Sequence, residues 1–288
     1  MSTIAFLLVV GSSFIHATWN LLQKQASTTG LAFSWLFNCI GVVIYTPFIA
    51  IVFFVLRPHM SWLGLVFIIV SALIHIGYFL FLQKGYRVSD LSVVYPISRG
   101  LGPVFATLLA VLFLHESPNV LTLMGTAVIV ISIFFIAGGM KLINGKIGMQ
   151  GPLYGIIVAI LIGWYTTWDK YAVDSLAILP LIYEYLSMVG QLLFLTPFAF
   201  IKRNQIAESW RKDKWQAAGV GVLSPLAYIL ALTALAIAPV SYIAPLRELS
   251  IVIGTLYGVI ILKEAQSRLQ IVYSGVLFLG VLCVALSS

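Results

Sequence analysis

Two arginines stand in stretches of this sequence that are otherwise almost free of charge. Arg99 lies in VYPISRG and is the only charged side chain between residues 91 and 114, and Arg247 lies in APLRE. A guanidinium presents a planar fork of donors that fits a carboxylate, phosphate or phosphonate. Both arginines are therefore candidates for binding an anionic group. The alternative is a structural ion pair, in which Arg247 would have Glu184 or Glu248 as its partner.

A second group of residues could bind a ligand or move protons within the same kind of stretch. Glu184 is the only acid in LIYEYLSMVGQ, and it could bind an ammonium group, carry a proton or neutralise an arginine. His16 and His75 are candidates for a proton relay, since histidine changes charge near neutral pH, although both could be hydrogen-bonded packing residues. The further candidates for ligand binding are Trp19, Asn20, Tyr78, Tyr95 and Trp164, the last of which could instead belong to an interfacial aromatic belt.

The composition indicates that these residues sit in a membrane. The chain is 61% hydrophobic and only 9% charged, whereas soluble domains are nearer half apolar and a quarter charged. Most of its apolar runs approach the ~20 residues that cross a hydrocarbon layer as a helix. The pattern predicts an all-α integral membrane protein with ten transmembrane helices, near residues 3–22, 31–56, 62–82, 91–114, 120–138, 152–168, 177–201, 216–236, 241–262 and 268–286.

The net charge of +7 is concentrated between these runs and does not point to nucleic acid. Twelve of the sixteen Lys and Arg residues fall in the odd-numbered connections, as in KRNQIAESWRKDK (202–214). Basic loops stay in the cytoplasm, so we expect those connections on the cytoplasmic side and both termini outside. This predicts a multi-pass protein of the cytoplasmic (inner) membrane.

The sequence also repeats itself. ATWN (17–20) returns as TTWD (166–169), and Pro96 and Arg99 in the first half have Pro245 and Arg247 as counterparts in the second. The repeat divides the chain into residues 1–140 and 150–288, joined by a loop at 141–149. Each half has five predicted helices, so the second half enters the membrane from the opposite side and the repeat is inverted. Inverted repeats are typical of secondary transporters, whose ligand binds near the midplane where the halves meet.

The position of Arg99 in its predicted helix agrees with such a site. Eight residues separate Leu91 from Arg99, which is about 12 Å of helix, and half a hydrocarbon core is about 15 Å. A charge at that depth needs a partner or water. Pro96, Gly100, Gly102 and Pro103 surround the arginine, and we expect them to loosen this helix.

At these motifs the sequence resembles the drug/metabolite transporter superfamily, in its ten-helix EamA-type branch. The matching segments are HATWNLLQK (16–24), GYRVSDLSVVYPISRG (85–100), LHES (114–117), TTWDK (166–170), APVSYIAPLRE (238–248) and LKE (262–264). The resemblance implies a 5+5 inverted-repeat helical bundle with a central cavity and alternating access. It also implies transport of a small metabolite, often an amino acid or a related compound.

Together these patterns predict a secondary active transporter for a small anionic or zwitterionic metabolite, such as an amino acid or an aminophosphonate. The expected partners are that small molecule, the lipid bilayer and protons as a candidate coupling ion, with the chain as a monomer or homodimer. The alternative is an intramembrane enzyme or lipid-binding receptor that uses the arginines on a lipid phosphate. We expect no enzyme activity, cofactor or metal site, because no enzyme or ATPase motif is present and Cys39 and Cys283 lie in different runs. Glu116 is predicted to be structural, at the start of a helix capped by Ser117.

Overall fold

The computed structural model describes residues 2–28, 30–58, 60–89, 91–136, 148–261 and 268–287, and all regular structure in these ranges is helical. Glu264, which belongs to the sequence repeat, and most of the predicted connecting loop lie outside the described residues. The helices are α1 (Thr3–Gln25), α2 (Leu31–Leu56), α3 (Trp62–Val88), α4 (Leu91–Phe113), α5 (Val120–Ile136), α7 (Gln150–Asp174), α8 (Pro180–Ile201), α9 (Arg203–Ile237), α10 (Val240–Leu246), α11 (Leu249–Ile260) and α12 (Arg268–Leu286).

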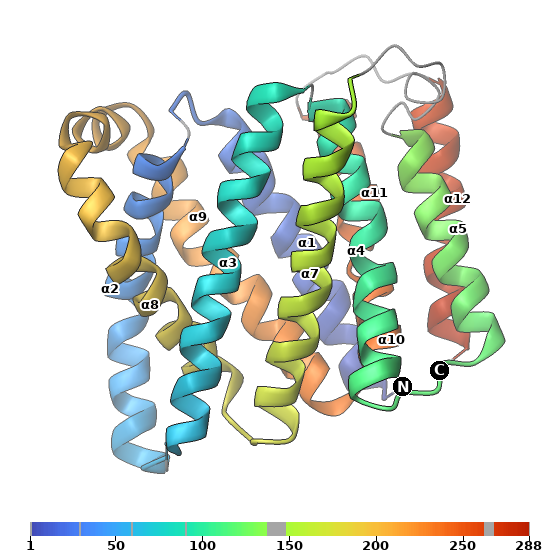
Figure 1. Cartoon of the computed structure of the whole chain (residues 1–288), viewed down its shortest axis with the longest axis horizontal. Coiled ribbons are helices and arrows are strands. Elements are labelled where there is room, and N and C mark those ends of the chain that lie inside the picture. Colours follow the sequence, from blue (N-terminus) through green and yellow to red (C-terminus); the bar gives the residue numbers. More distant parts are fainter. Residues whose placement is uncertain are drawn as a thin grey trace.

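The helices form a membrane-spanning bundle, as the composition predicted. Seven of the described helices are long and apolar enough to cross a bilayer, and α4 and α5 contribute shorter apolar segments. Large apolar side chains cover the outside, including Phe54 at 81% exposure and Phe200 at 75%. This is the surface that a lipid solvent requires. The two chain termini lie at the same end of the bundle (Figure 1), as an even number of crossings demands.

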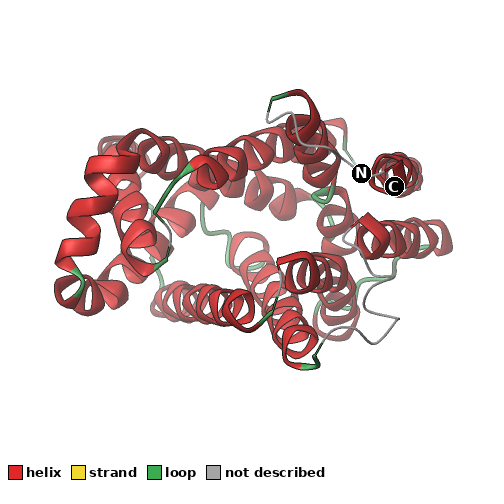
Figure 2. Ribbon diagram, turned by 90° about the horizontal axis from the view of Figure 1, so that it is seen from above, coloured by secondary structure: helices red, strands yellow, loops and turns green. Residues whose placement is uncertain are grey.

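The packing of the helices repeats the internal symmetry of the sequence. Helices α7, α8, α9, the α10–α11 pair and α12 are the second-half counterparts of α1 to α5. Helix α4 contacts α7, and their counterparts α11 and α1 also contact each other. In the same way the α3–α7 contact corresponds to the α9–α1 contact, and the α2–α9 contact corresponds to the α8–α3 contact. The α5–α12 and α2–α8 contacts each join a helix to its own counterpart. The fold is thus a ten-span inverted repeat in which the halves interlock (Figures 1 and 2).

Helix α7 is the central element of the bundle and carries part of the site described below. Half of the residues in its most apolar segment are buried inside the protein, compared with 11% for α2. Gly155 and Gly163 allow α7 to lie directly against α4, since a Cβ atom at Gly163 would come within 2.6 Å of the Phe105 Cβ and 2.8 Å of the Ala106 nitrogen. Small residues permit this kind of close approach between membrane helices.

The helix break near the arginines lies in the second half and not in the first. The Pro and Gly residues around Arg99 do not interrupt α4, which is one helix from Leu91 to Phe113. The run predicted at 241–262 is instead divided into α10 and α11, with Arg247 and Glu248 between them. Here the amides of Glu248 and Ser250 bond to the carbonyls three residues earlier, at 3.1 and 3.2 Å. The division is therefore a tightened turn, and Pro245 at its edge lacks the amide that a regular helix would use.

The charged segment before the predicted eighth span is also helical. Helix α9 begins at Arg203 and contains a kink at Asp213, whose φ and ψ are −129° and 25°. Its first turns run across the bundle, and the remainder runs along it (Figures 1 and 2). The Asp213 carboxylate accepts hydrogen bonds from the backbone amides of Ser27 and Thr28 at 2.9 and 2.7 Å, and also from their hydroxyls. Asp213 thereby ties the kink of α9 to the loop between α1 and α2.

The role predicted for Glu116 and Ser117 is corrected in one respect. Helix α5 is capped by Asn119, whose Oδ1 accepts from the Thr122 amide at 2.8 Å. The Glu116 carboxylate accepts from the amides of Val240 and Ser241, at 2.7 and 2.9 Å. It does lie at the positive end of a helix, where an acid is favourable, but that helix is α10 of the opposite half. Glu116 thus joins the two halves.

Candidate functional site

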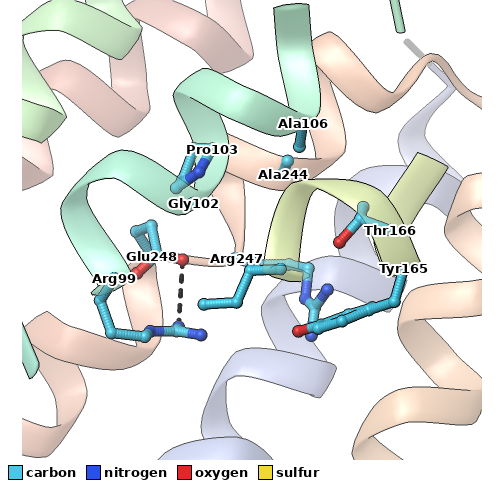
Figure 3. Close-up of a pocket in the computed structure, with 10 residues that line it drawn as sticks. Arg99, Gly102, Pro103, Ala106, Tyr165, Thr166, Ala244, Arg247 and Glu248 are labelled. Atoms are coloured by element: carbon cyan, nitrogen blue, oxygen red, sulfur yellow. Dashed lines mark ion pairs between the residues drawn. The ribbon is translucent and has the colours of Figure 1, made fainter. Parts of the chain in front are cut away.

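The two arginines meet in one cavity between the halves of the protein. Arg99 comes from the middle of α4, whereas Arg247 and Glu248 form the turn between α10 and α11 (Figure 3). Helix α7 closes the cavity from another side. The lining residues are Arg99, Gly102, Pro103, Ala106, Ile162, Tyr165, Thr166, Ala244, Arg247 and Glu248. The space that a water-sized sphere can enter is about 10 Å³, which is room for a single water molecule.

Arg99 forms an ion pair with Glu248 across the boundary between the halves. Their closest nitrogen and oxygen are 3.0 Å apart, and the two side chains are 12% and 4% exposed. The sequence had offered Glu248 as a partner for Arg247. Consecutive residues point about 100° apart on a helix, so Glu248 is directed towards α4 and Arg247 is not. The other carboxylate oxygen of Glu248, Oε2, is buried without a hydrogen-bond partner among the described residues.

Arg247 has an aromatic neighbour where the sequence suggested a carboxylate. Its guanidinium carbon lies 5.4 Å from the centre of the Tyr228 ring, which is a cation–π distance. No Asp or Glu oxygen lies within 4.0 Å of the guanidinium in the part of the chain that the structure describes. Among the described lining residues there are therefore two guanidinium groups and one carboxylate, whose formal charges sum to one positive charge.

Tyr228 contacts Arg247 through its ring and a buried carboxylate, Asp169, through its hydroxyl. Asp169 was not among the residues selected from the sequence. Asp169 on α7 is fully buried. It accepts hydrogen bonds from the hydroxyls of Tyr183 on α8 at 2.7 Å and Tyr228 on α9 at 2.6 Å. The sequence contained one indication, because Asp169 is the repeat counterpart of Asn20 in the ATWN and TTWD segments. Lys170 and Asp174 follow it closely in the sequence, and such a group of charges is typical of the polar end of a membrane helix.

Two other predicted residues lie in an aromatic cluster next to the cavity. The His75 ring is 4.3 Å from Tyr165 and 5.7 Å from Tyr228, and the Tyr78 ring is 6.0 Å from Tyr165. The His75 Nδ1 lies 2.9 Å from the carbonyl oxygen of Ser71. Nδ1 also lies 3.3 Å from the Ser71 hydroxyl. A carbonyl only accepts, so the contact with the carbonyl is a hydrogen bond in the tautomer that carries its proton on Nδ1.

The candidates on α1 lie outside the lining of the cavity. The rings of His16 and Trp19 are in edge contact at 4.8 Å. The Asn20 amide donates to the His16 carbonyl of its own helix at 2.8 Å. Trp19 packs on a separate apolar cluster formed with Phe33 and Val220.

The remaining candidates likewise do not line the cavity, or lie outside the described side chains. Glu184 is 9% exposed and does not line the cavity. Trp164 is 41% exposed and contacts Phe113, because it is one position before the inward-facing Tyr165 and points to the outside of the bundle. Trp168 donates to the Phe67 carbonyl at 3.0 Å and stacks on the Phe67 ring. The side chain of Tyr95 is not among the described ones.

Comparison with known proteins agrees with this architecture. The model of the EamA-like transporter family matches residues 3–138 and again residues 149–286. No curated protein matches the sequence. A solved structure titled only "Crystal structure of protein" superposes with a TM-score of 0.74 over 99% of this chain and 99% of that chain. The identity between the two is 13%, so this likeness concerns the fold. Because the family model matches twice and together covers nearly the whole sequence, the chain belongs to the EamA-like transporter family.

Proposed function

We propose that this membrane transporter moves a small metabolite carrying an acid group, with an amino acid or an aminophosphonate as the favoured class. The observation that carries the proposal is the meeting of Arg99, Arg247 and Glu248 in one cavity, with residues from both halves of the repeat. A ligand in that cavity contacts both halves at once. Relative movement of the halves would then change its access from one side of the membrane to the other.

The charges of the cavity support a ligand with an acid group and an amine. The Arg247 guanidinium has no carboxylate within ion-pair distance among the described residues, so its fork can receive the carboxylate or phosphonate. Glu248 has one oxygen on Arg99 and a second oxygen without a partner, which can receive an ammonium group. A lipophilic cation would meet a net positive charge in a medium of low dielectric, where repulsion is strong. Tyr165 supplies an aromatic wall for the rest of the ligand.

The ion pair and the small cavity support alternating access. The described arrangement leaves room for about one water molecule, so a metabolite enters only when the lining helices separate. The Arg99–Glu248 pair and the Glu116 contacts with α10 both connect the halves. In this mechanism the halves are residues 1–140 and 150–288, joined by 141–149, and the chain works in the cytoplasmic membrane as a monomer or homodimer.

We further propose a proton gradient as the energy source, with Glu184, His16 and His75 as the candidate proton carriers. His75 is the best placed of the three, because its ring contacts Tyr165 in the wall of the cavity. Trp19, Asn20, Tyr78 and Tyr95 remain candidates for ligand binding at the periphery. Trp164 is replaced in this role by Tyr165, which is its neighbour on the inward face of α7.

The proposal is tested by counterflow in proteoliposomes. Vesicles loaded with unlabelled glycine, L-serine, L-phenylalanine or 2-aminoethylphosphonate are diluted into the labelled compound, with ethanolamine as a matched ligand that lacks the acid. We expect saturable uptake of at least one acid ligand, none of ethanolamine, and loss of uptake in Arg247→Ala. Preferred uptake of ethanolamine, or unchanged uptake of an acid ligand by Arg247→Ala, would contradict the anion-binding role. Proton coupling is tested in vesicles without internal ligand and with an imposed proton gradient, where a protonophore should abolish accumulation.

A further inference from the structure

The buried carboxylate of Asp169 has no role in the site as described so far. It is fully buried, and a buried ionised group is costly unless it is paired or fully hydrogen-bonded. Its neighbour in sequence, Lys170, is engaged with Asp174 at 2.8 Å. In the described ranges no Lys, Arg or His nitrogen lies within 4.0 Å of the Asp169 oxygens. Each oxygen is instead satisfied by one tyrosine hydroxyl, from Tyr183 or Tyr228.

The two tyrosines differ in what their rings contact. Tyr183 is packed in the main apolar core with 0% exposure. Tyr228 carries the Arg247 guanidinium over its ring at 5.4 Å, and its edges meet His75 and Tyr165 at 5.7 and 6.1 Å. The hydroxyl end of Tyr228 is therefore fixed by Asp169, while the ring face holds the arginine. A hydroxyl that donates to a carboxylate also makes its ring more electron-rich, which strengthens attraction to a cation.

We infer that Asp169 is a positioning residue for Arg247, which it orients through Tyr228, and that it thereby determines the affinity of the cavity for the acid group of a ligand. The two arginines are then held by different devices. Arg99 pairs directly with the Glu248 carboxylate. Arg247 is linked to the Asp169 carboxylate only through Tyr228, so its donor fork stays open towards the cavity. This inference rests on the proposed function, because it assigns a residue to the binding of that same ligand.

The repeat counterpart of Asp169 supports a role specific to the second half. Asn20 occupies the equivalent position on α1, and its amide donates to the carbonyl of His16 in its own helix. It makes no such link to an arginine in the described part of the first half. The carboxylate at 169 is therefore not explained by symmetry of packing alone.

The chain offers a matched pair of variants for the test. Tyr228→Phe and Tyr183→Phe each remove one hydroxyl from the same carboxylate and each leave one Asp169 oxygen unsatisfied, but only Tyr228 touches Arg247. Dissociation constants for glycine, L-serine, L-phenylalanine and 2-aminoethylphosphonate are measured by calorimetry on the full chain in detergent. We expect Tyr228→Phe and the near-isosteric Asp169→Asn to weaken binding of the acid ligand by about tenfold, and Tyr183→Phe by less than about twofold. Thermal stability should fall by similar amounts in the two Phe variants.

A double-mutant cycle identifies the path of the effect. In an Arg247→Ala background, Tyr228→Phe should cause no further loss of affinity if Asp169 and Tyr228 act through Arg247. Equal losses in Tyr183→Phe and Tyr228→Phe, or additive losses with Arg247→Ala, would overturn the inference and leave Asp169 with a structural role. If Tyr228→Phe does not fold, Asp169→Asn is compared with Tyr183→Phe by the same criterion. A wild-type protein that binds none of the four acid ligands would instead overturn the proposed function, and the inference with it.

Discussion

The Arg99–Glu248 ion pair should be the strongest single polar link between the two halves. Its side chains are 12% and 4% exposed and its shortest distance is 3.0 Å, so both charges are withdrawn from water. Removing the arginine of such a pair leaves the carboxylate buried without its cation, which typically costs about 3–5 kcal/mol. For Arg99→Met, which keeps most of the apolar stem, Oε1 of Glu248 would lose its partner, and Oε2 already has none among the described residues. We expect a loss of about 3 kcal/mol in the free energy of unfolding.

The measurement is equilibrium unfolding in mixed micelles, arranged as a double-mutant cycle. Glu248→Leu should also be destabilising, because it removes the carboxylate that pairs with Arg99. Arg99→Met combined with Glu248→Leu should return to within about 1 kcal/mol of the wild type, because an apolar pair replaces a buried ionic one at little net cost. The exposed Lys212–Glu208 pair, 2.6 Å apart with both side chains nearly half exposed, is the matched control. A coupling energy for Arg99 and Glu248 no larger than the ~0.2–1 kcal/mol of exposed pairs would refute the reasoning.

Three further outcomes follow from contacts outside the cavity. Glu116→Gln should lower the free energy of unfolding by about 1–3 kcal/mol, because the glutamine amide has only one oxygen for the two α10 backbone amides that the carboxylate now satisfies. An unchanged free energy of unfolding in mixed micelles would contradict the link between the halves. Burial alone would raise the pKa of the Asp213 carboxyl, but hydrogen bonds from the α1–α2 loop outweigh it and lower the pKa. Its stabilising effect is therefore present at neutral pH and is lost as the pH falls through the lowered pKa. Asp213→Asn should thus differ from wild type in thermal stability at pH 7, and the difference should shrink as the pH falls through the lowered pKa. Gly163→Ala should lower the free energy of unfolding by about 1–3 kcal/mol, because the new Cβ would meet the backbone of α4 at Phe105. Gly254→Ala should be close to neutral, because a Cβ there would have nothing within 4 Å. Equal effects of the two substitutions would exclude close packing as the cause.

The sequence predicted the fold well, because in a membrane the length and polarity of a segment decide whether it spans. The runs at 31–56 and 268–286 coincide with α2 and α12. The inverted repeat was visible in paired motifs, and the packing repeats it. Counting residues along a helix predicted that Arg99 lies near the middle of its span, and it lies in the middle of α4. None of these predictions needed the path of the chain in three dimensions.

The partners within the site could not be predicted in the same way. Glu248 is adjacent to Arg247 in sequence, and its pairing with Arg99 depends on how α4 approaches the α10–α11 turn. Proline and glycine mark where a helix can break, and more of them surround Arg99 than Arg247, but the break occurs beside Pro245. Asp169 was overlooked because a carboxylate next to a lysine resembles the end of a span. Its burial depends on hydroxyls that come from two other helices.

The unequal fourth and ninth spans have an energetic consequence for a protein built from inverted halves. In a perfectly symmetric pair, exchanging the conformations of the halves would turn an outward-facing protein into an inward-facing one of equal energy. Here α4 is continuous and its counterpart is divided at Arg247 and Glu248, so the exchange cannot give an equivalent structure. An energy difference of only 1.4 kcal/mol between the end states is a tenfold difference in population. Under the alternating access proposed above, the divided span gives the protein an intrinsic resting side, and the opposite conformation is reached uphill in every cycle.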